Sequence, residues 1–232
     1  MSRKALAIHG GAGTILKSQM TADLEREYRS GLEAALKVGW SVLQDGGASL
    51  DAVEAAVISL EDFPLFNAGR GSVFTHEGKQ EMDACIMNGA ELKAGAVAFV
   101  KNIRNPISLA RLVMERTEHV LLAGEGANQF AEQIGIPTES DEYFFTEHRW
   151  LQLQEAIAEG RVQLDHAAAK PIGTVGAVAC DSKGNLAAAT STGGMTNKKF
   201  GRVGDTPMVG VGNYADGTCA VSCTGHGEFF ML

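Results

Sequence analysis

The chain has 232 residues, of which 45% are hydrophobic and 21% are charged, a composition typical of a soluble globular domain. Its formal net charge of −8 argues against nucleic acids and anionic membrane surfaces as partners, because both require a basic face. The apolar run before His9 is too short for a signal peptide, and the run over residues 94–100 is far below the ~20 residues of a membrane span, so we expect a cytoplasmic protein without a membrane segment.

The first predicted element is a buried strand that ends at His9. It leads into the loop His9-Gly10-Gly11-Ala12-Gly13, where glycines permit positive φ or close backbone approach. The loop does not belong to an α/β-hydrolase, because the chain has no Gly-x-Ser-x-Gly elbow, nor is it a P-loop, because no Gly-Lys-Ser/Thr follows. We interpret it as a structural turn beneath a site.

Apolar residues at helical spacing predict a first helix over residues 21–45. A second helix is predicted over residues 49–60, with the hydroxyl of Ser49 as its N-terminal cap. The two helices are expected to pack as one layer. Pro64 and the glycines after it then predict a loop up to residue 71.

The middle of the chain combines a hairpin with alternating helices and strands. Strands over residues 82–87 and 92–100 flank Asn88-Gly89, a strong hairpin signal. A helix is expected from Asn105-Pro106 to Arg116, because proline suits the first helical turn.

A short strand over residues 120–123 and a helix that opens at Gly124 are expected next. The segment 139–170 is polar and poorly patterned, and we interpret its tail as a flexible linker.

A second hairpin is predicted over residues 173–194. A loop of three residues (182–184) or of five (181–185) gives the same register, in which Cys180 pairs with Leu186. Thr174 then lies opposite Thr192. Directly opposed residues share one face of a sheet with Cβ atoms roughly 4.5–5.5 Å apart, so the two hydroxyls are expected to meet.

Thr190 is predicted to pair with Gly176 in this register, away from Thr174, so its hydroxyl is expected to matter little to any chemistry at Thr174. Facing threonines also occur in ordinary sheets, because threonine is a favoured strand residue.

Gly173 before Thr174 favours a catalytic interpretation. Glycine tolerates strained backbone, and strain before a hydroxyl residue is what self-cleavage by an N-to-O acyl shift needs. Cleavage would free the α-amine of Thr174, whose reference pKa is about 7.7–8.0, as a base beside the hydroxyl.

A third hairpin is predicted over residues 208–215 and 218–224, joined by a two-residue turn at Asp216-Gly217. Thr224 ends its second strand, where Gly225 takes over. The four cysteines lack the paired spacing of metal ligands, and we expect free thiols, as in cytosolic proteins, at Cys85, Cys180, Cys219 and Cys223.

Five motifs spread over almost the whole chain carry a family resemblance. They are Ala7-Ile-His-Gly-Gly-Ala-Gly13, Gly173-Thr-Val-Gly-Ala-Val-Ala179, Asn185-Leu-Ala-Ala-Ala-Thr-Ser-Thr-Gly-Gly-Met-Thr-Asn-Lys198, Gly201-Arg-Val-Gly-Asp205 and Ser222-Cys-Thr-Gly225. Together they resemble plant-type L-asparaginase/isoaspartyl peptidase, an N-terminal nucleophile hydrolase.

The resemblance implies an α/β fold, a four-layer αββα sandwich, here without the C-terminal part found in relatives. It implies one domain over residues 1–232, cut by itself between Gly173 and Thr174 into an α subunit (1–173) and a truncated β subunit (174–232). Two cleaved protomers are expected to assemble as (αβ)2, and the substrates are expected to be L-asparagine and β-aspartyl dipeptides.

The resemblance, together with the chemistry of amide hydrolysis, assigns roles to the motif residues. Thr174 is the expected nucleophile and base, oriented by Thr192, and Thr224 with the N–H of Gly225 forms the expected oxyanion hole. Arg202 and Asp205 match the carboxylate and ammonium of an amino-acid head group. The resemblance adds further pocket residues at Val203, Gly204, Gly227 and Asn67.

No cofactor is expected to be required. The resemblance adds a structural sodium ion bound by main-chain oxygens of the loop at Leu60, Glu61, Phe63, Phe66, Ala68 and Arg70. Two other functions remain open at this point: a glycosylasparaginase-like amidase, and an inactive fragment that only pairs with another chain.

Overall fold

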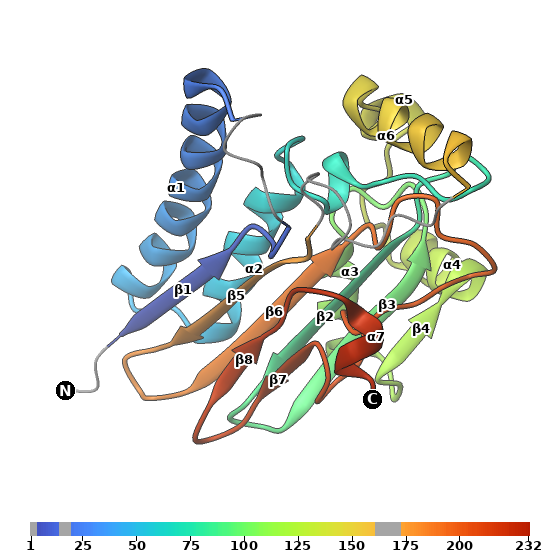
Figure 1. Cartoon of the computed structure of the whole chain (residues 1–232). Helices are drawn as coiled ribbons and strands as arrows, with labels where there is room; N and C mark the ends of the chain where they lie inside the picture. The colour runs from blue at the N-terminus through green and yellow to red at the C-terminus, as the bar shows by residue number, and fades with distance from the viewer. Residues whose placement is uncertain (1–3, 14–19, 161–172) are drawn as a thin grey trace.

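The computed structural model describes residues 4–13, 20–160 and 173–232. Its centre is a six-stranded sheet with the strand order β1-β5-β6-β2-β3-β4 (Figure 1). The strands of this sheet are β1 (Ala5–His9), β2 (Met82–Asn88), β3 (Lys93–Val100), β4 (Leu121–Ala123), β5 (Val175–Cys180) and β6 (Leu186–Thr192). All neighbours pair antiparallel except β3 and β4, which are parallel. All six of these strands were predicted and are confirmed, and the strands of the Gly173 hairpin lie inside the sheet. The predicted strands over residues 208–215 and 218–224 are confirmed only over Asn213–Ala215 and Ala220–Ser222.

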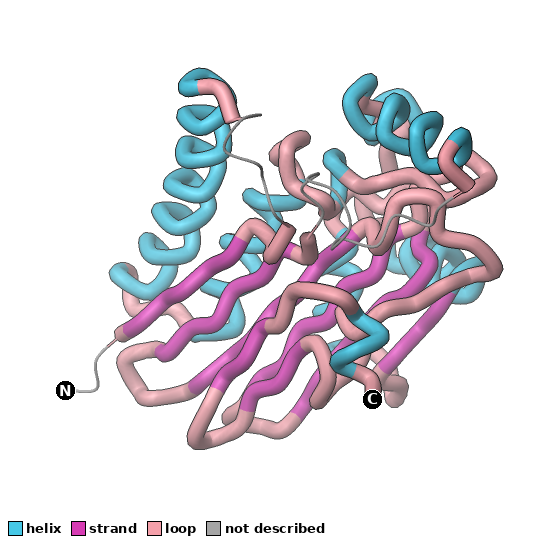
Figure 2. The backbone as a smooth tube through the Cα atoms, viewed as in Figure 1, coloured by secondary structure: helices cyan, strands magenta, loops and turns pink. Residues whose placement is uncertain are grey.

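Helices cover one face of this sheet, as Figure 2 shows. They are α1 (Ala22–Gln44), α2 (Ser49–Glu61), α3 (Pro106–Arg116) and α4 (Gly124–Ile134). Helices α1 and α2 pack on each other, and α2 lies over β5 and β6, so the predicted helical layer is confirmed. The Ser49 cap is wrong: Ala48 is the N-cap residue and makes no side-chain hydrogen bond, while Ser49 is the first helical residue.

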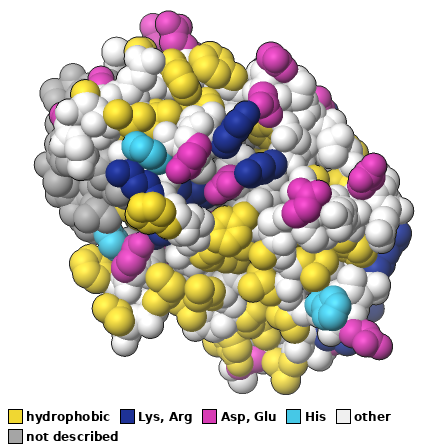
Figure 3. Space-filling view, turned by 90° about the vertical axis from the view of Figure 1, so that its right-hand side faces the viewer, with side chains coloured by type: hydrophobic (Ala, Val, Ile, Leu, Met, Phe, Trp, Pro, Cys, Tyr) yellow, Lys and Arg dark blue, Asp and Glu magenta, His cyan; other side chains and the backbone are white. Residues whose placement is uncertain are grey.

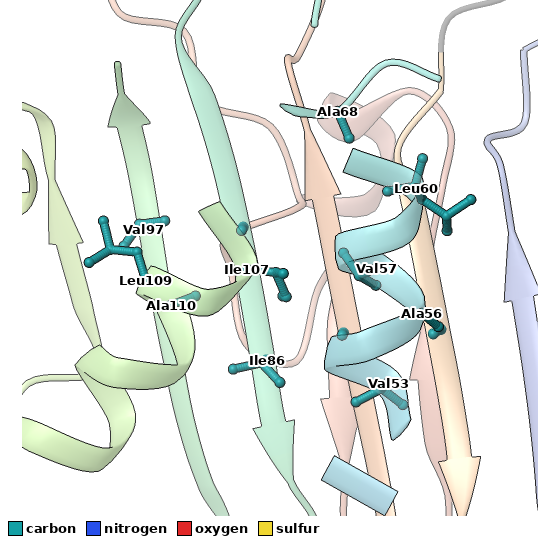
Figure 4. Packing of buried hydrophobic residues seen from close by; sticks show 14 of the residues in the cluster. Val53, Ala56, Val57, Leu60, Ala68, Ile86, Val97, Ile107, Leu109 and Ala110 are labelled. Atoms are coloured by element: carbon teal, nitrogen blue, oxygen red, sulfur yellow. The ribbon is translucent and has the colours of Figure 1, made fainter. Parts of the chain in front are cut away.

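The core lies between these helices and the sheet. Val53, Ala56, Val57 and Leu60 of α2 point toward the sheet (Figure 4) and are fully buried. Strands β5 and β6 meet them with alanines, because small side chains let a helix approach the sheet closely. Each fully buried valine or leucine contributes about 1.5–3 kcal/mol.

The opposite face of the six-stranded sheet carries a second sheet of two antiparallel strands, β7 (Asn213–Ala215) and β8 (Ala220–Ser222). Ala188 and Met87 pack against Ala215 between the two sheets. The layers are therefore helix, sheet and sheet, three of the four layers of the predicted αββα sandwich. The chain continues into the four-residue helix α7 (Gly227–Phe230).

Two hairpin turns differ from their predictions. The β2–β3 loop has four residues, because Asn88 pairs with Lys93. The turn at Asp216-Gly217 also spans four residues, because Ala215 pairs with Ala220 rather than with Thr218. In that turn Oδ1 of Asp216 accepts from the backbone N–H groups of Thr218 and Cys219, which stabilises the longer loop. The central hairpin has the five-residue loop at 181–185.

The polar segment after residue 139 contains two helices that the sequence did not predict, α5 (Asp141–Phe144) and α6 (Glu147–Ala158). Helix α6 turns polar residues inward, so it has no clean apolar stripe. Its Arg149 is 2% exposed and donates to the carbonyl oxygens of Gly71 and Leu65. These bonds fix α6 over the short 3-10 helix η1 (Gly69–Gly71). The predicted linker tail lies outside the described residues.

Three further observations concern the surface, the helices and the cysteines. On the face in Figure 3, basic side chains lie among acidic ones rather than in one continuous patch. Among the described helices none is long and apolar enough to span a bilayer. The four cysteines are free thiols in this structure, with Cys85 buried.

Candidate active site

The predicted register of the central hairpin is confirmed. Val175 pairs with Ser191 and Gly176 with Thr190, down to Cys180 with Leu186. Thr174 precedes β5 by one residue, which puts it at the end of the sheet where β6 terminates at Thr192. Both threonines belong to the face that carries the second sheet, because the alternate face, with Ala177 and Ala189, belongs to the helix-covered core.

The hydroxyl of Thr174 has a different partner from the expected one. Its Oγ1 lies 3.0 Å from Oγ1 of Thr206, and the residue is only 6% exposed. Oγ1 of Thr192 instead accepts from the backbone N–H of Gly194 at 3.0 Å. The register thus brings the two threonines to one sheet end, but the contact of Thr174 goes to Thr206, on the loop after β6.

Thr206 is anchored by Thr190. The hydroxyl of Thr190 donates to the carbonyl oxygen of Thr206 at 3.1 Å, and both residues are buried. Thr190 is therefore linked to Thr174 through Thr206, although it pairs with Gly176 as predicted. The expectation that the Thr190 hydroxyl is remote from the nucleophile is corrected by this chain of contacts.

A pocket opens beside Thr174 and brings together seven of the predicted site residues. These are Gly173, Thr174, Thr192, Arg202, Gly204, Asp205 and Gly225, and the pocket is completed by Gly194, Met195, Thr206 and His226. Three predicted residues, Val203, Thr224 and Asn67, are not among the residues that line it.

Gly227 is also absent from the pocket lining, yet it lies against the charged groups. A Cβ at this position would come within 2.8 Å of Oδ1 of Asp205 and 3.0 Å of Nη2 of Arg202. Because any larger side chain would push these groups apart, glycine allows Arg202 and Asp205 to sit together under the last turn of the described chain.

Arg202 and Asp205 present opposite charges at the pocket. Arg202 donates from Nε and Nη2 to the two carboxylate oxygens of Glu228, each at 2.8 Å. Asp205 is 3% exposed, and its Oδ2 is buried without a hydrogen-bond partner among the described residues. Burial raises the pKa of Asp205, and the positive charge of Arg202 opposes that rise.

The glycine-rich N-terminal loop lies against both the cleavage point and the expected oxyanion hole. A Cβ on Gly11, whose φ is +114°, would approach the Cα of Gly173 to 2.7 Å. The next residue, Ala12, donates its N–H to Oγ1 of Thr224 at 3.0 Å. Gly225 has φ of +151°, a conformation that favours glycine. The loop thus connects strand β1 to the cleavage point at Gly173 and to the expected oxyanion hole at Thr224.

His9 connects β1 to the second sheet beneath this loop. Its Nε2 lies 2.7 Å from Oγ of Ser222, whose hydroxyl also donates to the carbonyl oxygen of Ala189 at 3.2 Å. All three of these atoms lie over Gly176, where a Cβ would collide with them. Burial lowers the pKa of His9, so the neutral imidazole is favoured.

Asn67 supports the site from behind. Its side chain donates to the carbonyl oxygen of Gly194 at 2.8 Å and accepts from the N–H of Val73 at 3.1 Å. Its own carbonyl accepts from the N–H of Gly193. Asn67 lines a second cavity with Gly173. The structure therefore places it under the turn that follows Thr192, where it holds the backbone.

The loop predicted to bind sodium is crowded with carbonyl oxygens. A Cβ on Gly69 would lie 2.5 Å from the carbonyl oxygen of Glu61, and one on Gly71 would overlap the carbonyls of Phe66 and Pro64. Glycine lets the chain pass this close to the carbonyl oxygens. Main-chain oxygens are ligands of the kind that a hard cation accepts, and the sodium ion itself stays a prediction. No group of three or more His, Cys, Asp or Glu suited to a metal occurs in the described residues.

Sequence reasoning missed Thr206 and Glu228, as well as the lining residues Gly194, Met195 and His226. Thr206 follows Asp205 directly, so a hydroxyl beside a predicted substrate-binding carboxylate was the available signal. Glu228 follows Gly227, and an acidic residue beside a pocket glycine was a candidate partner for Arg202.

Comparisons with known proteins point to one family along almost the whole chain. A family model described as asparaginase matches residues 2–232. An isoaspartyl peptidase of Salmonella typhimurium is 52% identical over all of this chain and 76% of its own length. An isoaspartyl peptidase of Escherichia coli is 52% identical over all of this chain and 74% of its own. An isoaspartyl peptidase/L-asparaginase of Homo sapiens is 50% identical over 97% of this chain and 72% of its own.

Proposed function

Because this chain belongs to the asparaginase family of N-terminal nucleophile hydrolases, we propose that it is a self-cleaving threonine amidohydrolase acting on L-asparagine and β-aspartyl dipeptides. The observation that carries the proposal is one pocket lined by Gly173, Thr174, Arg202 and Asp205. It unites a cleavable bond and a hydroxyl nucleophile with opposite charges that match an amino-acid head group.

Self-cleavage begins when Oγ1 of Thr174 attacks the carbonyl carbon of Gly173. The peptide nitrogen leaves, and an ester joins Gly173 to the threonine oxygen. Water then hydrolyses the ester, which leaves a carboxylate on Gly173 and a free α-amine on Thr174. The products are an α subunit of residues 1–173 and a β subunit from residue 174 onward. The close approach of Gly11 to Gly173 supports this step, because close packing restricts the scissile peptide.

Hydrolysis uses the same hydroxyl after cleavage. The free amine of Thr174 accepts the hydroxyl proton, and the oxygen attacks the side-chain carbonyl of the substrate. Ammonia leaves from asparagine, or the α-amine of the second residue leaves from a β-aspartyl dipeptide. Water then releases L-aspartate from the threonine ester.

The surrounding residues hold the substrate and the developing charge. Arg202 binds the α-carboxylate and Asp205 the α-ammonium, with Gly204 and Gly227 leaving space for them. Thr192 fixes the turn at Gly194 beside the nucleophile. The hydroxyl of Thr224 and the N–H of Gly225 stabilise the oxyanion.

Three features of the proposal concern the protein as a whole. The cleaved protomers pair as (αβ)2, and the protein works in the cytoplasm, in keeping with its four free cysteines. The main-chain oxygens of the loop from Leu60 to Arg70 hold a structural sodium ion, which supports Asn67 and takes no part in the reaction.

Mass spectrometry after long incubation tests the cleavage, and release of L-aspartate from a β-aspartyl dipeptide tests the hydrolysis. Pieces of 173 and 59 residues are expected from the wild type and an intact chain of 24.5 kDa from Thr174→Ala. Thr174→Ser keeps a hydroxyl and is expected to cleave slowly. An intact wild-type chain that releases no L-aspartate would contradict the proposal.

A further inference from the structure

The carboxylate of Glu228 holds Arg202 by a side-on pair of hydrogen bonds. Nε and Nη2 each donate to one of the two carboxylate oxygens at 2.8 Å. Such a bidentate pair fixes the plane of the guanidinium as well as its position, and it occupies two of five N–H donors. The three donors that remain therefore have a fixed direction.

Arg202 faces the pocket, and Glu228 does not. Arg202 lines the pocket together with Thr174, whereas Glu228 is not among the lining residues. Nη1 lies 2.9 Å from the place of a Cβ on Gly204, and Nη2 lies 3.0 Å from that of a Cβ on Gly227. Side chains at these two glycines would press on the guanidinium, so glycine leaves Nη1 and Nη2 free of side chains there. Glu228 holds the guanidinium through Nε and Nη2.

Asp205 supplies the second half of the recognition. Its Oδ2 is buried without a hydrogen-bond partner among the described residues. Its Oδ1 and Nη2 of Arg202 both lie within 3.0 Å of the place of a Cβ on Gly227, so the two charged groups flank the same glycine. An unpaired buried carboxylate oxygen costs free energy, and a substrate ammonium would relieve that cost. The carboxylate of Asp205 and the guanidinium of Arg202 in one pocket fit an α-amino acid whose ammonium and carboxylate groups are both unsubstituted.

We propose that Glu228 is a positioning residue for substrate binding, which holds Arg202 so that its free N–H groups meet the α-carboxylate. Glu228 acts through Arg202 and does not touch the substrate. It belongs to α7, directly after Gly225 and Gly227, so one short segment carries an oxyanion donor and the anchor of the arginine (Figure 1). The inference deepens the proposed function and rests on it for the nature of the ligand.

Binding of L-aspartate, followed by calorimetry on the purified full chain, tests this inference without requiring catalysis. The expected result is roughly fivefold to tenfold weaker binding by Glu228→Gln, because one acceptor and the charge are lost while the shape is kept. Glu228→Asp keeps the charge on a shorter side chain, so its affinity for L-aspartate is expected to lie between those of the wild type and Glu228→Gln. The control is Glu125→Gln, an exposed glutamate that also lies in the first turn of a helix, and binding is expected to be unchanged.

A double-mutant cycle separates positioning through Arg202 from a merely structural role. In an Arg202→Lys background, Glu228→Gln is expected to weaken binding less than twofold further, because the fork it orients is gone. With a β-aspartyl dipeptide, Glu228→Gln is expected to raise KM and leave kcat within twofold, since the head group is held equally in ground and transition states.

Tighter binding by Glu228→Gln would overturn the inference, because it would make Glu228 a competitor of the substrate carboxylate. Unchanged binding, or a wild type that binds no L-aspartate, would also overturn it. A wild type that binds L-aspartate but hydrolyses neither substrate would reject the proposed function, and calorimetry would still decide the role of Glu228.

Discussion

The hydroxyl oxygens of Thr174 and Thr206 lie 3.0 Å apart in a buried contact, although 32 residues separate them in the chain. Thr206 directly follows Asp205, the buried carboxylate of the same pocket. The contact therefore ties the candidate nucleophile to the loop that carries the charged groups for the substrate, and a shift of that loop reaches the nucleophile directly.

Replacing Thr206 tests this contact. Thr206→Val keeps the size of the side chain but removes the hydroxyl, so the Thr174 hydroxyl loses its buried partner. We expect self-cleavage and hydrolysis to slow by roughly 10²-fold, as for other misplaced catalytic groups. The control is Thr206→Ser, which keeps the hydroxyl and is expected to stay within a few-fold of the wild type. Equal rates for both variants in a time course of cleavage would show that the contact has no catalytic role.

Replacing Thr192 separates a catalytic effect from a structural one. Thr192→Val deletes the acceptor of the Gly194 N–H, and an unsatisfied buried donor costs about 1–3 kcal/mol. We expect a lower free energy of unfolding in urea together with slower hydrolysis. Thr192→Ser keeps the hydroxyl acceptor, so it is expected to retain most of the wild-type free energy of unfolding and most of the rate of hydrolysis.

Thr190→Val is expected to slow the reaction less than Thr192→Val, and to do so by loosening Thr206. Its hydroxyl bond to the carbonyl oxygen of Thr206 is the link that would be lost. Combining Thr190→Val with Thr206→Val measures this link: the two losses are expected to be less than additive. Fully additive losses in rate would contradict the route through Thr206.

Gly11→Ala is expected to impair self-cleavage and folding together. The residue has φ of +114°, and an added Cβ would press against the Cα of Gly173 at 2.7 Å. The strain is expected to cost about 1–3 kcal/mol and to displace the scissile peptide. The control is Gly126→Ala in α4, where a Cβ would meet nothing within 4 Å and helix propensity improves. A Gly11→Ala chain that cleaves at the wild-type rate would show that this contact does not restrict Gly173.

Glu61 is expected to make stability depend on pH. The side chain is fully buried, accepts from Ser191 Oγ at 2.6 Å and from Ile107 N–H at 3.0 Å, and burial raises its pKa from 4.5 to about 8. Between these values the folded chain binds more protons than the unfolded chain, so this group's contribution to stability falls as pH rises from about 4.5 to about 8.

Glu61→Gln removes this titration. The Tm of the wild type is expected to fall, relative to that of Glu61→Gln, as the pH is raised from 5 to 8. The slope is the readout, because the amide also changes stability by a constant amount. Parallel Tm curves for the two proteins would mean that Glu61 titrates normally in the folded chain.

The sequence by itself determined most of the elements, the register of the central hairpin and most of the pocket residues. Alternation along β5 and β6 and the loop between Cys180 and Leu186 are local properties, so they set which residues face each other. Arg202 and Asp205 were predictable through the family resemblance of their motif, whereas residue type alone would have favoured an ordinary surface ion pair. Helix α6 was not, since burial of Arg149 against backbone carbonyls removes the apolar stripe that reveals a helix.

Only the tertiary structure decided the partners of the catalytic groups. Thr174 meets Thr206 rather than Thr192, because the loop after β6 folds back across the end of the sheet. Arg202 meets Glu228 because α7 returns to the same place. Side-chain partners that are far apart in the chain depend on how loops cross the sheets, and neither strand periodicity nor motif spacing encodes that path.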